Sequence, residues 1–513
     1  MPRSPGGAPD SAEVETMAGP KRFLGALLVL ATVAACAPGI AQPAPQPAAP
    51  PAPTTTTRPS RPAPPAPAPV ADRGRQSAGV VAAGAEAPYN YGPAVLAEGG
   101  RIRMWWCSQL RFADPPGDDL LHAEAASPSG PFTAPDGGPG QAVLSGSVTG
   151  FDGKHVCDPS VLKVGGTYYL YYTGAAGEHA NGNAIGVATS PDGVRWTRDA
   201  GGQPIVSPAY DTTRDNTYGA GQPSVLFVDG WFYLMFTDTT GRAAGWNGAG
   251  QFVLRARDPA FLNHVEALGE RGFEPVADTR KPRTRSVVDA FSADWMFVDA
   301  LDAFAIAHET EHGTTITFWN RDFTGNPVPP VTIPGRWREG PGLVRTPDGH
   351  APVAAEDPCG RIPLDVVRAT VDGAAAAPTD LGHFGLDLAN APGCATAGTA
   401  RVLNGFAVPS PENTVDLVVG GKVVRVERRS VTDRLATRVL DRRPPVVDAL
   451  PLVARVPAGA KAVRAPDGRL ALLLEDKLWL VAAEEVLALN SSTVTAVTQQ
   501  TWDGYEQAGD LRR

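Results

Sequence analysis

Carboxylates stand at the heads of two otherwise apolar stretches of this sequence. Asp158 begins the stretch "DPSVLKVGGTYYLYYTG", and Glu339 begins "EGPGLVRTPDGHAPVAA". Two carboxyl groups in different surroundings can divide the tasks of a general acid and a general base between them. The pair is therefore a candidate for proton-transfer chemistry, provided that the fold brings the two heads together. The alternative is that each side chain only caps a turn.

The segments that carry these residues are copies of one pattern. The clearest copies lie at 91–107, 157–173 and 221–237, a weaker copy lies at 292–308, and a fifth lies at 339–355. Each copy has a turn residue, usually followed by Pro, and then two β-rich runs separated by a Gly or Asp break, which predicts a hairpin. Two further short strands follow each copy, as in "NAIGVATSPDGVRWTR" at 183–198. Four strands in each of five units predict an all-β fold, a five-bladed β-propeller; a sandwich of similar hairpins is the alternative.

The predicted ring places the first residues of each unit around a common funnel. The first strand of a propeller blade is the innermost one, so the residue before Pro159 faces the funnel and not the core. We expect Asp158 and Glu339 to be the catalytic residues there. Residues expected to bind substrate in the same funnel are Gln222, Trp337, Tyr91, Asp238 and Asp294. For each of these residues the alternative is a structural role in a turn or in the core.

The pattern "DPSVL…GTYYLYYTG…IGVATSPDGVRWTR" resembles the five-bladed propellers of glycoside hydrolase families 43 and 62 and of related fructosidase-like enzymes. The resemblance covers about residues 85–375. It implies hydrolysis of pentose-containing glycans such as arabinan or xylan. It also implies three funnel carboxylates: a base in the first blade, an Asp that tunes pKa values in the second, and a Glu acid in the third. The Asp of the second blade corresponds to Asp158.

The other two family positions are not carboxylates in this sequence. Gly92 stands where the base is expected, and Gln222 stands where the acid is expected. Blades 2 and 5 are second neighbours in a ring of five, as are the base and acid blades of the families. Asp158 and Glu339 can then face each other across a sugar, at the separation of about 6.5–9.5 Å that inverting hydrolysis needs. We expect Asp158 to be the base and Glu339, beside Trp337, to be the acid.

The N-terminal region predicts export. Two cations precede an apolar stretch from Phe23 to Val33, and the motif "VAAC" follows, ending at Cys36. This is the pattern of a signal peptide, too short for a spanning helix. It resembles the lipobox of bacterial lipoproteins, which implies lipidation of Cys36 and an extracytoplasmic protein anchored to the bacterial cell membrane. An ordinary signal peptide is the alternative. The Pro-, Ala- and Thr-rich residues that follow predict an extended linker.

Cysteine count and charge narrow the possible partners. The chain has five cysteines, and the four that remain besides Cys36 are an even number in an exported protein. This predicts two disulfides, which we assign as Cys107–Cys157 and Cys359–Cys394. The spacing of His and Cys residues shows no metal motif, so we predict no cofactor; a calcium ion in the funnel has no motif to support it. The net charge of −9 and the scattered Lys and Arg residues argue against a nucleic-acid partner.

The sequence divides into four parts: a signal segment at 1–36, a linker at 37–84, a propeller at 85–375 and a β-rich C-terminal region at 376–513. The expected function is that of an exported, inverting glycoside hydrolase whose partner is a polysaccharide or an oligosaccharide. The alternative is a non-catalytic carbohydrate-binding propeller lipoprotein that has lost the full acid and base set.

Overall fold

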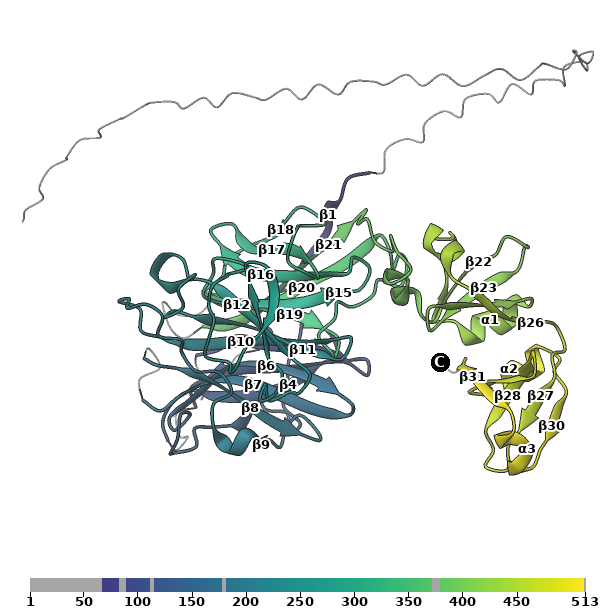
Figure 1. Ribbon diagram of the computed structural model, residues 1–513, viewed down its shortest axis with the longest axis horizontal. Coiled ribbons are helices and arrows are strands. Elements are labelled where there is room, and N and C mark those ends of the chain that lie inside the picture. Colours follow the sequence, from purple (N-terminus) through teal and green to yellow (C-terminus); the bar gives the residue numbers. More distant parts are fainter. Residues whose placement is uncertain (1–66, 83–88, 111–114, 178–180, 371–378, 512–513) are drawn as a thin grey trace, which may run out of the picture. The chain divides into compact units, whose positions relative to one another are not determined.

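The computed structural model describes residues 67–82, 89–110, 115–177, 181–370 and 379–511. The predicted signal segment, Cys36 and most of the predicted linker therefore lie outside the described residues. Among the residues that are described, no helix is both long enough and apolar enough to span a membrane. The described chain consists mostly of β-strands, which confirms the predicted all-β class (Figure 1).

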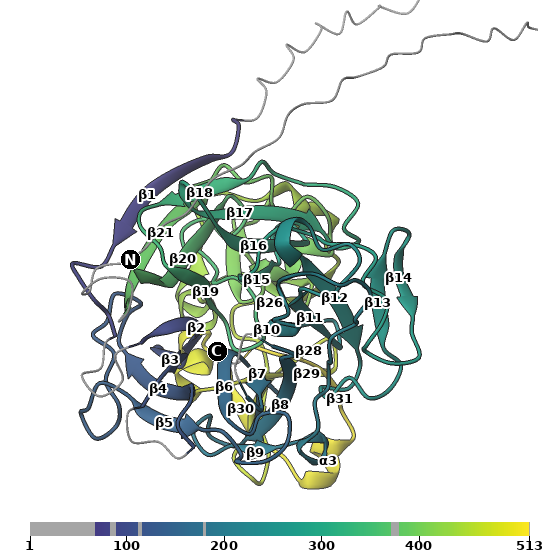
Figure 2. The same ribbon diagram turned by 90° about the vertical axis from the view of Figure 1, so that its left-hand side faces the viewer.

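The sheets of the propeller lie around a common axis (Figure 2), and we group their strands into five blades. Blade 1 consists of β2 (Tyr91–Glu98), β3 (Arg101–Ser108), β4 (Asp119–Ala125) and β5 (Gln141–Leu144), and blade 2 of β6 (His155–Val164), β7 (Thr167–Ala175), β8 (Ala184–Ser190) and β9 (Thr197–Arg198). Blade 3 consists of β10 (Ala220–Val228), β11 (Trp231–Asp238), β12 (Gln251–Ala256), β13 (Glu266–Gly269) and β14 (Gly272–Pro275). Blade 4 consists of β15 (Ala293–Val298), β16 (Ala303–Thr310), β17 (Gly313–Asn320) and β18 (Val331–Pro334), and blade 5 of β19 (Glu339–Arg345), β20 (Arg361–Thr370), β21 (Asp380–Ala389) and β1 (Val70–Gln76).

The first strand of each blade is the innermost one. The inner strands β2, β6, β10, β15 and β19 each contact the next around the ring. Strand β19 also pairs in parallel with β2, with Val344 opposite Val95, which closes the ring. This arrangement confirms the predicted propeller architecture and brings the starts of all inner strands to one end of the axis.

Blade 5 is completed by a strand from the other end of the propeller chain. Strand β1 pairs antiparallel with β21, so both ends of the propeller are held in one sheet. The Arg75 guanidinium lies 2.6 Å from Asp365 and 2.7 Å from Asp387. Both strands fall outside the predicted propeller range of 85–375, so this boundary is corrected at both ends. The sequence of β1, "VADRGRQ", is polar and lacks the apolar alternation that predicts a strand. Ion pairs hold this strand in place instead of apolar contacts.

The apolar core is divided among the spaces between neighbouring blades. Separate clusters of buried residues fill the spaces between blades 2 and 3, between blades 3 and 4 and between blades 4 and 5, and a further cluster joins blade 1 to its two neighbours. Each blade is thus covered on both faces, which explains why strands such as β11, "WFYLMFTD", are apolar on both sides.

Both predicted disulfides are present. Cys107 of β3 is bonded to Cys157 of β6 and ties blade 1 to blade 2. Cys359 is bonded to Cys394 and joins the segment before β20 to the segment after β21. The first disulfide therefore lies next to Asp158, at the head of the second blade.

The C-terminal region contains two copies of one small fold. The first has β22 (Phe406–Pro409), β23 (Val415–Val419), β24 (Lys422–Val426), α1 (Arg429–Leu435), β25 (Arg438–Val439) and β26 (Leu452–Val456), and the second has β27 (Ala462–Arg464), β28 (Leu470–Leu474), β29 (Lys477–Val481), α2 (Glu484–Leu489), β30 (Val494–Ala496), α3 (Gln499–Asp503) and β31 (Glu506–Asp510). The sheet orders β25-β22-β23-β24-β26 and β30-β27-β28-β29-β31 are equivalent, with both edge strands parallel to their neighbours. Short 3-10 turns, η1 to η4, lie at Ala200–Gly202, Trp246–Gly248, Thr399–Leu403 and Pro445–Ala449.

Candidate functional site

Four of the inner strands begin with a bulge just before their Pro. The residue that precedes Pro has a positive φ in each case: 53° at Gly92, 47° at Asp158, 51° at Gln222 and 20° at Gly340. The pairing with the second strand shifts at the same point. A bulge redirects a side chain, and the left-handed conformation is unfavourable for Asp and Gln. The chain therefore holds Asp158 and Gln222 in a strained conformation at the mouth of the funnel.

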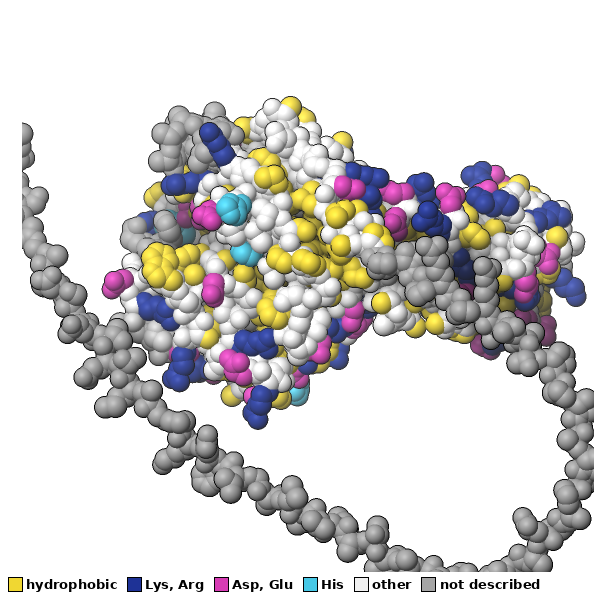
Figure 3. Space-filling model, turned by 90° about the horizontal axis from the view of Figure 1, so that it is seen from above, with side chains coloured by type: hydrophobic (Ala, Val, Ile, Leu, Met, Phe, Trp, Pro, Cys, Tyr) yellow, Lys and Arg dark blue, Asp and Glu magenta, His cyan; other side chains and the backbone are white. Residues whose placement is uncertain are grey.

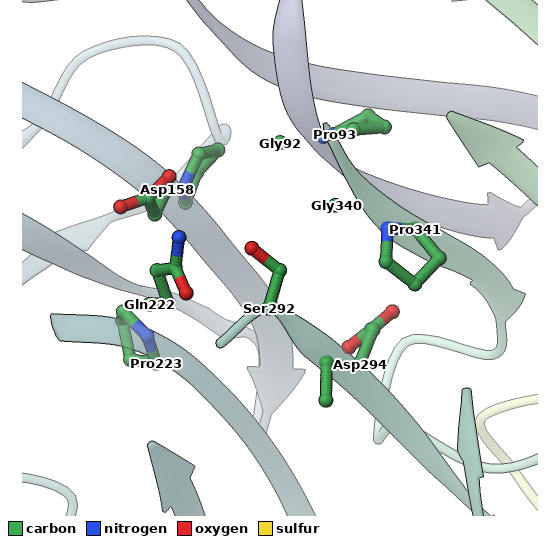
Figure 4. Close-up of a pocket in the computed structure, with 11 residues that line it drawn as sticks. Gly92, Pro93, Asp158, Gln222, Pro223, Ser292, Asp294, Gly340 and Pro341 are labelled. Carbon is green, nitrogen blue, oxygen red and sulfur yellow. The ribbon is translucent and has the colours of Figure 1, made fainter. Parts of the chain in front are cut away.

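Two hollows lie at this end of the axis. The larger one, here called the mouth cavity, has a volume of about 370 Å³ and is lined by Tyr89, Tyr91, Gln109, Asp118, His155, Cys157, Asp158, Thr173, Ala175, Asn183, Tyr218, Gln222 and Glu339. The smaller one, here called the axis pocket, has a volume of about 40 Å³ and is lined by residues from the starts of all five inner strands (Figure 4). Asp158 and Gln222 belong to both. The structure thus brings Asp158 and Glu339, the two predicted catalytic residues, into one cavity.

Asp158 is a half-buried carboxylate with hydroxyl partners and no cationic partner among the groups that set its pKa. The Tyr218 hydroxyl donates a hydrogen bond to Asp158 Oδ2 over 3.2 Å. Burial raises the pKa of Asp158 to about 6; hydrogen bonds from Thr173 and Tyr218 oppose the rise, and the charge of Asp118 adds to it. The group is therefore ionised at neutral pH but holds a proton about two pH units higher than an exposed Asp does.

Glu339 is the first residue of β19 and lies on the blade 5 side of the mouth cavity. Burial raises the pKa of Glu339 to about 8, and the charges of Asp158 and Asp118 add to the rise. The neighbouring Arg338 opposes it only weakly, as the last of the four causes. At neutral pH the Glu339 carboxyl therefore carries a proton. The predicted raised pKa comes from burial and like charges, and not from Trp337.

A third carboxylate, Asp118, was not predicted from the sequence. It is almost fully buried just before β4, and Gln109 Nε2 donates to its Oδ1 over 2.8 Å. His155 Nδ1 lies 2.9 Å from Asp118 Oδ2. A carboxylate oxygen of Asp118 and the sulfurs of Cys107 and Cys157 lie within 4.8 Å of one another. The two sulfurs are bonded to each other in a disulfide, which removes them as thiolate ligands for a metal ion.

Gln222 and Gly92 occupy the two positions at which the sequence resemblance implied carboxylates. Gln222 Oε1 is buried and has no hydrogen-bond partner among the described residues, so it can accept a hydrogen bond from a ligand. A Cβ atom at Gly92 would lie 3.2 Å from Asp158 Oδ1. A side chain at position 92 would therefore crowd the Asp158 carboxylate, and it would also be strained at a φ of 53°.

The two aromatic residues predicted to bind substrate differ in position. Tyr91 lines the mouth cavity but is only 7% exposed, its hydroxyl lies 2.9 Å from Cys157 Sγ, and its ring meets Tyr89 edge to face. It forms part of the wall. Trp337 is 37% exposed and donates from Nε1 to the Thr310 carbonyl over 2.7 Å, and it is not one of the residues that line the mouth cavity.

Asp238 and Asp294, also predicted to bind substrate, are occupied by partners within the protein. Asp238 is fully buried, lies 3.1 Å from Arg283 Nε and accepts a hydrogen bond from the Ala209 N–H over 2.9 Å, outside the mouth cavity. Asp294 lines the axis pocket, but its Oδ1 lies 3.1 Å from Arg345 Nη1 and its Oδ2 accepts from the Leu343 N–H over 2.7 Å. Both carboxylates have the partners expected of structural ion pairs.

Polar residues at the starts of third strands also reach the mouth cavity. Asp118 directly precedes β4 of blade 1, and Asn183 directly precedes β8 of blade 2. In an antiparallel blade the third strand starts at the same end as the first, so the residues before both strands meet at the mouth. A polar residue directly before the third strand of a repeat was therefore the signal that could have identified Asp118.

Neither a protein-family model nor a curated protein matches the sequence. The chain is similar to the family 117 glycoside hydrolase Zg3597 of the marine bacterium Zobellia galactanivorans, with 12% identity and a TM-score of 0.42 over 62% of this chain and 91% of that chain. It is also similar to the catalytic domain of a Coprinopsis cinerea GH62 α-L-arabinofuranosidase, with 13% identity and a TM-score of 0.39 over 62% of this chain and 97% of that chain. A third similar structure is CoXyl43, a GH43 β-xylosidase/α-arabinofuranosidase from a compost microbial metagenome, with 12% identity and a TM-score of 0.38 over 68% of this chain and 99% of that chain.

Proposed function

We propose that the protein is an inverting glycoside hydrolase in which Asp158 is the base and Glu339 is the acid. The observation that carries the proposal is that two carboxyl groups line one cavity with pKa values of about 6 and about 8. Between these two values Asp158 is ionised while Glu339 keeps its proton. One group can therefore accept a proton at the pH at which the other donates one.

The proposed reaction is a single displacement at the anomeric carbon. Glu339 donates its proton to the glycosidic oxygen while the bond between this oxygen and the anomeric carbon breaks, and the leaving group departs as an alcohol. Asp158 accepts a proton from a water molecule, whose oxygen bonds to the anomeric carbon from the opposite side. Asp158 ends protonated and Glu339 ionised, and proton exchange with solvent restores both groups. The product has the inverted anomeric configuration.

Asp118 supports this division of roles through its charge. Its negative charge raises the pKa of Glu339 and that of Asp158. Gln109 and His155 hold the Asp118 carboxylate in place. Asp118 thus helps to keep Glu339 protonated at neutral pH, and it is a positioning and tuning residue in this proposal.

The substrate that fits the mouth cavity is a neutral sugar. The negative charges of Asp118 and Asp158 repel an anionic ligand, while hydroxyl and amide groups of Thr173, Asn183, Tyr218 and Gln222 are suited to sugar hydroxyls. On the face shown in Figure 3, basic and acidic side chains are interspersed, which gives no extended basic area for a polyanion. We assign the substrate to pentose-containing glycans such as arabinan or xylan, the class that the sequence resemblance implies.

A carbohydrate-binding propeller without activity is the second candidate. The observation that favours it is the identity of the residues before Pro in the inner strands: of Gly92, Asp158, Gln222 and Gly340, only Asp158 is a carboxylate. Glu339 lies one residue further back than this set, at the start of β19. A protein of this kind would bind a glycan through Gln222 and its neighbours and release no sugar.

Activity on a panel of aryl-pentosides, arabinan, xylan and their oligosaccharides tests the proposal. We expect the wild type to release sugar, and we expect Asp158→Asn and Glu339→Gln to lower kcat by at least about 100-fold, because each removes one member of the acid and base pair. Proton NMR of the first product should show the inverted anomer. The change Asp136→Asn, at an exposed carboxylate, is the matched control and should leave kcat unchanged.

Three outcomes separate the candidates. If both site variants hydrolyse as fast as the wild type, the catalytic roles are wrong. If the wild type binds a glycan but releases no sugar, the binding protein is the correct reading. If the first product retains its configuration, a covalent mechanism replaces the single displacement proposed here.

We also propose that the mature chain is a lipoprotein held at the outer side of the bacterial cell membrane through Cys36. Support comes from the sequence alone: a short apolar stretch that is followed by "VAAC" and then by a Pro-rich spacer. Mass spectrometry of the mature N-terminal peptide should find a diacylglyceryl group on Cys36. The change Cys36→Ser should release the protein from the membrane fraction or block its processing; unchanged membrane association would contradict the anchor.

A further inference from the structure

Two large aromatic side chains are exposed in the connections that flank strands β10 and β11 of blade 3. Tyr210 is 70% exposed and Trp246 is 84% exposed. Aromatic rings of this size contribute most when they are buried, and Trp is well buried in most proteins. Leaving both rings in water is unfavourable unless a ligand covers them, so their surroundings are informative.

Tyr210 lies directly beside the mouth cavity. A Cβ atom at Gly182 would lie 3.7 Å from the Tyr210 hydroxyl, and the next residue, Asn183, lines the cavity. The segment that carries Tyr210 runs on to Tyr218, which lines the cavity and donates to Asp158. Tyr210 therefore belongs to the rim of the proposed active site.

Trp246 lies at the same end of blade 3. It is part of the connection between β11 and β12. Asp238, at the end of β11, pairs with Ala220 at the start of β10, so this connection lies at the end of the blade where the inner strand begins. That is the end at which the mouth cavity opens.

Hydrogen bonds fix the two aromatic segments to each other. The Arg214 guanidinium donates to the carbonyls of Gly245 over 2.8 Å and of Gly241 over 3.0 Å. Asn216 Nδ2 donates to the Asn247 carbonyl over 3.0 Å, and the backbone N–H of Tyr210 donates to Thr240 Oγ1 over 2.9 Å. The rings are thus carried by a preorganised surface, which lowers the entropy that a ligand must overcome on binding.

A second hollow, a groove, lies against Tyr210. It has a volume of about 570 Å³, and its lining includes Tyr210, Pro208 and the segment 276–282. Its charged residues are paired: Arg280 Nη2 lies 2.7 Å from Asp278, and Lys281 Nζ lies 3.2 Å from Asp211. With its charged residues paired and the exposed Tyr210 in its lining, the groove suits a neutral ligand.

We infer that Tyr210 and Trp246 form an aromatic platform for the part of a neutral oligosaccharide that extends out of the mouth cavity. Sugar rings present C–H groups on their faces, and Tyr and Trp offer large, rigid contact areas at a low cost in conformational entropy. The chain of the ligand would run from the carboxyl pair across Tyr210 into the groove. This inference rests on the proposed glycan substrate and adds that the protein recognises several sugar units.

The test compares short and long ligands in the variants Tyr210→Ala, Trp246→Ala and their double variant. For a pentose hexasaccharide we expect KM to rise about tenfold in the double variant, while kcat/KM for an aryl-pentoside stays unchanged, because the small substrate does not reach the platform. The conservative changes Tyr210→Phe and Trp246→Phe should keep most of the affinity, and unchanged thermal unfolding shows that the loops are intact. Leu262→Ala is the matched control, since Leu262 is 64% exposed beyond the other end of β12.

The outcomes distinguish this inference from the proposed function. If the wild type cleaves the hexasaccharide and the double variant has the same KM for it, the platform is wrong and the hydrolase stands. If the wild type binds the hexasaccharide without cleaving it, calorimetric titration replaces KM, and about tenfold weaker binding in the double variant supports the platform although the catalytic proposal fails. If the wild type neither cleaves nor binds any glycan of the panel, both are overturned.

Discussion

The carboxyl groups of the mouth cavity and of the axis pocket have different kinds of partner. In the axis pocket, Asp294 is matched by Arg345, which is fully buried, and by the Leu343 N–H. In the mouth cavity, Asp158 has hydroxyl partners, and Glu339 is surrounded by other carboxylates. Asp158, Asp294 and Glu339 all lie near the starts of inner strands, so the difference between them comes from their partners and not from their position in the fold.

The difference shows where the fold trades stability for reactivity. A buried ion pair with satisfied hydrogen bonds keeps its charges and holds the inner strands together. Desolvated carboxyl groups that lack a paired cation cost stability, and the pKa values of Asp158 and Glu339 are raised as a result. The strained conformation of Asp158 adds to that cost. The arrangement of carboxyl groups in the mouth cavity is therefore not explained by a contribution to the stability of the fold.

Removing one partner of the axis pair should have the largest effect. In Asp294→Ala, Arg345 is left as a buried charge without its carboxylate, and we expect a loss of about 3–5 kcal/mol in the free energy of unfolding. Urea unfolding followed by tryptophan fluorescence measures it.

A double variant provides the control for this loss. Replacing both partners with apolar residues, Asp294→Leu with Arg345→Met, should recover much of the stability, since no charge is then left unpaired. A single variant as stable as the wild type would mean that Arg345 is satisfied by the carbonyls around it, such as that of Trp295 at 2.9 Å.

Replacing Glu339 in the mouth cavity should change stability in the opposite direction: at alkaline pH, Glu339→Gln should be more stable than the wild type. The Glu339 carboxyl has a pKa near 4.5 when unfolded and about 8 in the folded chain, so the native state binds more protons between these values. Stability of the wild type therefore falls as the pH rises from about 4.5 to about 8, and Glu339→Gln lacks this loss. Between pH 6 and pH 9 we expect the variant to gain about 2 kcal/mol relative to the wild type.

Chemical unfolding at several pH values measures this difference. Glu311→Gln is the matched control, because Glu311 is 85% exposed and should show no such trend. Parallel stability curves for the wild type and Glu339→Gln would show that Glu339 ionises normally in the folded protein, which would remove it as the acid.

The pH profile of hydrolysis should report both carboxyl groups. Activity falls below about pH 6 as Asp158 gains a proton and above about pH 8 as Glu339 loses its own, by about tenfold for each further pH unit. In Asp118→Asn the alkaline limit should move to lower pH, because the charge of Asp118 is one of the causes that raise the pKa of Glu339. The dependence of kcat/KM on pH measures the shift, and an alkaline limit that stays in place would show that another group sets it.

The sequence predicted the ring because the same hairpin recurs along the chain. Periodic apolar runs indicate burial, so the propeller and its inner strands follow from local patterns. The two disulfides were predicted from the even number of cysteines in an exported protein. Strand β1 was not predicted, because its polar residues are held by ion pairs with Asp365 and Asp387. These partners lie about 300 residues further along the chain and leave no local pattern.

The site was only partly predictable for a related reason. Asp158 and Glu339 were found because they head the repeats, but the same rule also selected Asp294, whose partner Arg345 stands at the far end of another inner strand. A carboxylate's partner depends on contacts between blades, which no local pattern records. Asp118 was missed because it precedes a third strand and not a first one.

The smallest expected effect concerns Gln222, a neutral residue that lines both the mouth cavity and the axis pocket. Its Oε1 is buried without a partner among the described residues, whereas both oxygens of Asp294 are engaged. In Gln222→Met the shape is kept and the acceptor is lost, so we expect KM to rise about fivefold, or about 1 kcal/mol, with kcat and thermal unfolding unchanged. The same change at the exposed Gln203 is the control. A drop in stability with an unchanged KM would place Gln222 with Asp294 as a structural residue, and the contrast between the two hollows would then rest on the carboxyl groups alone.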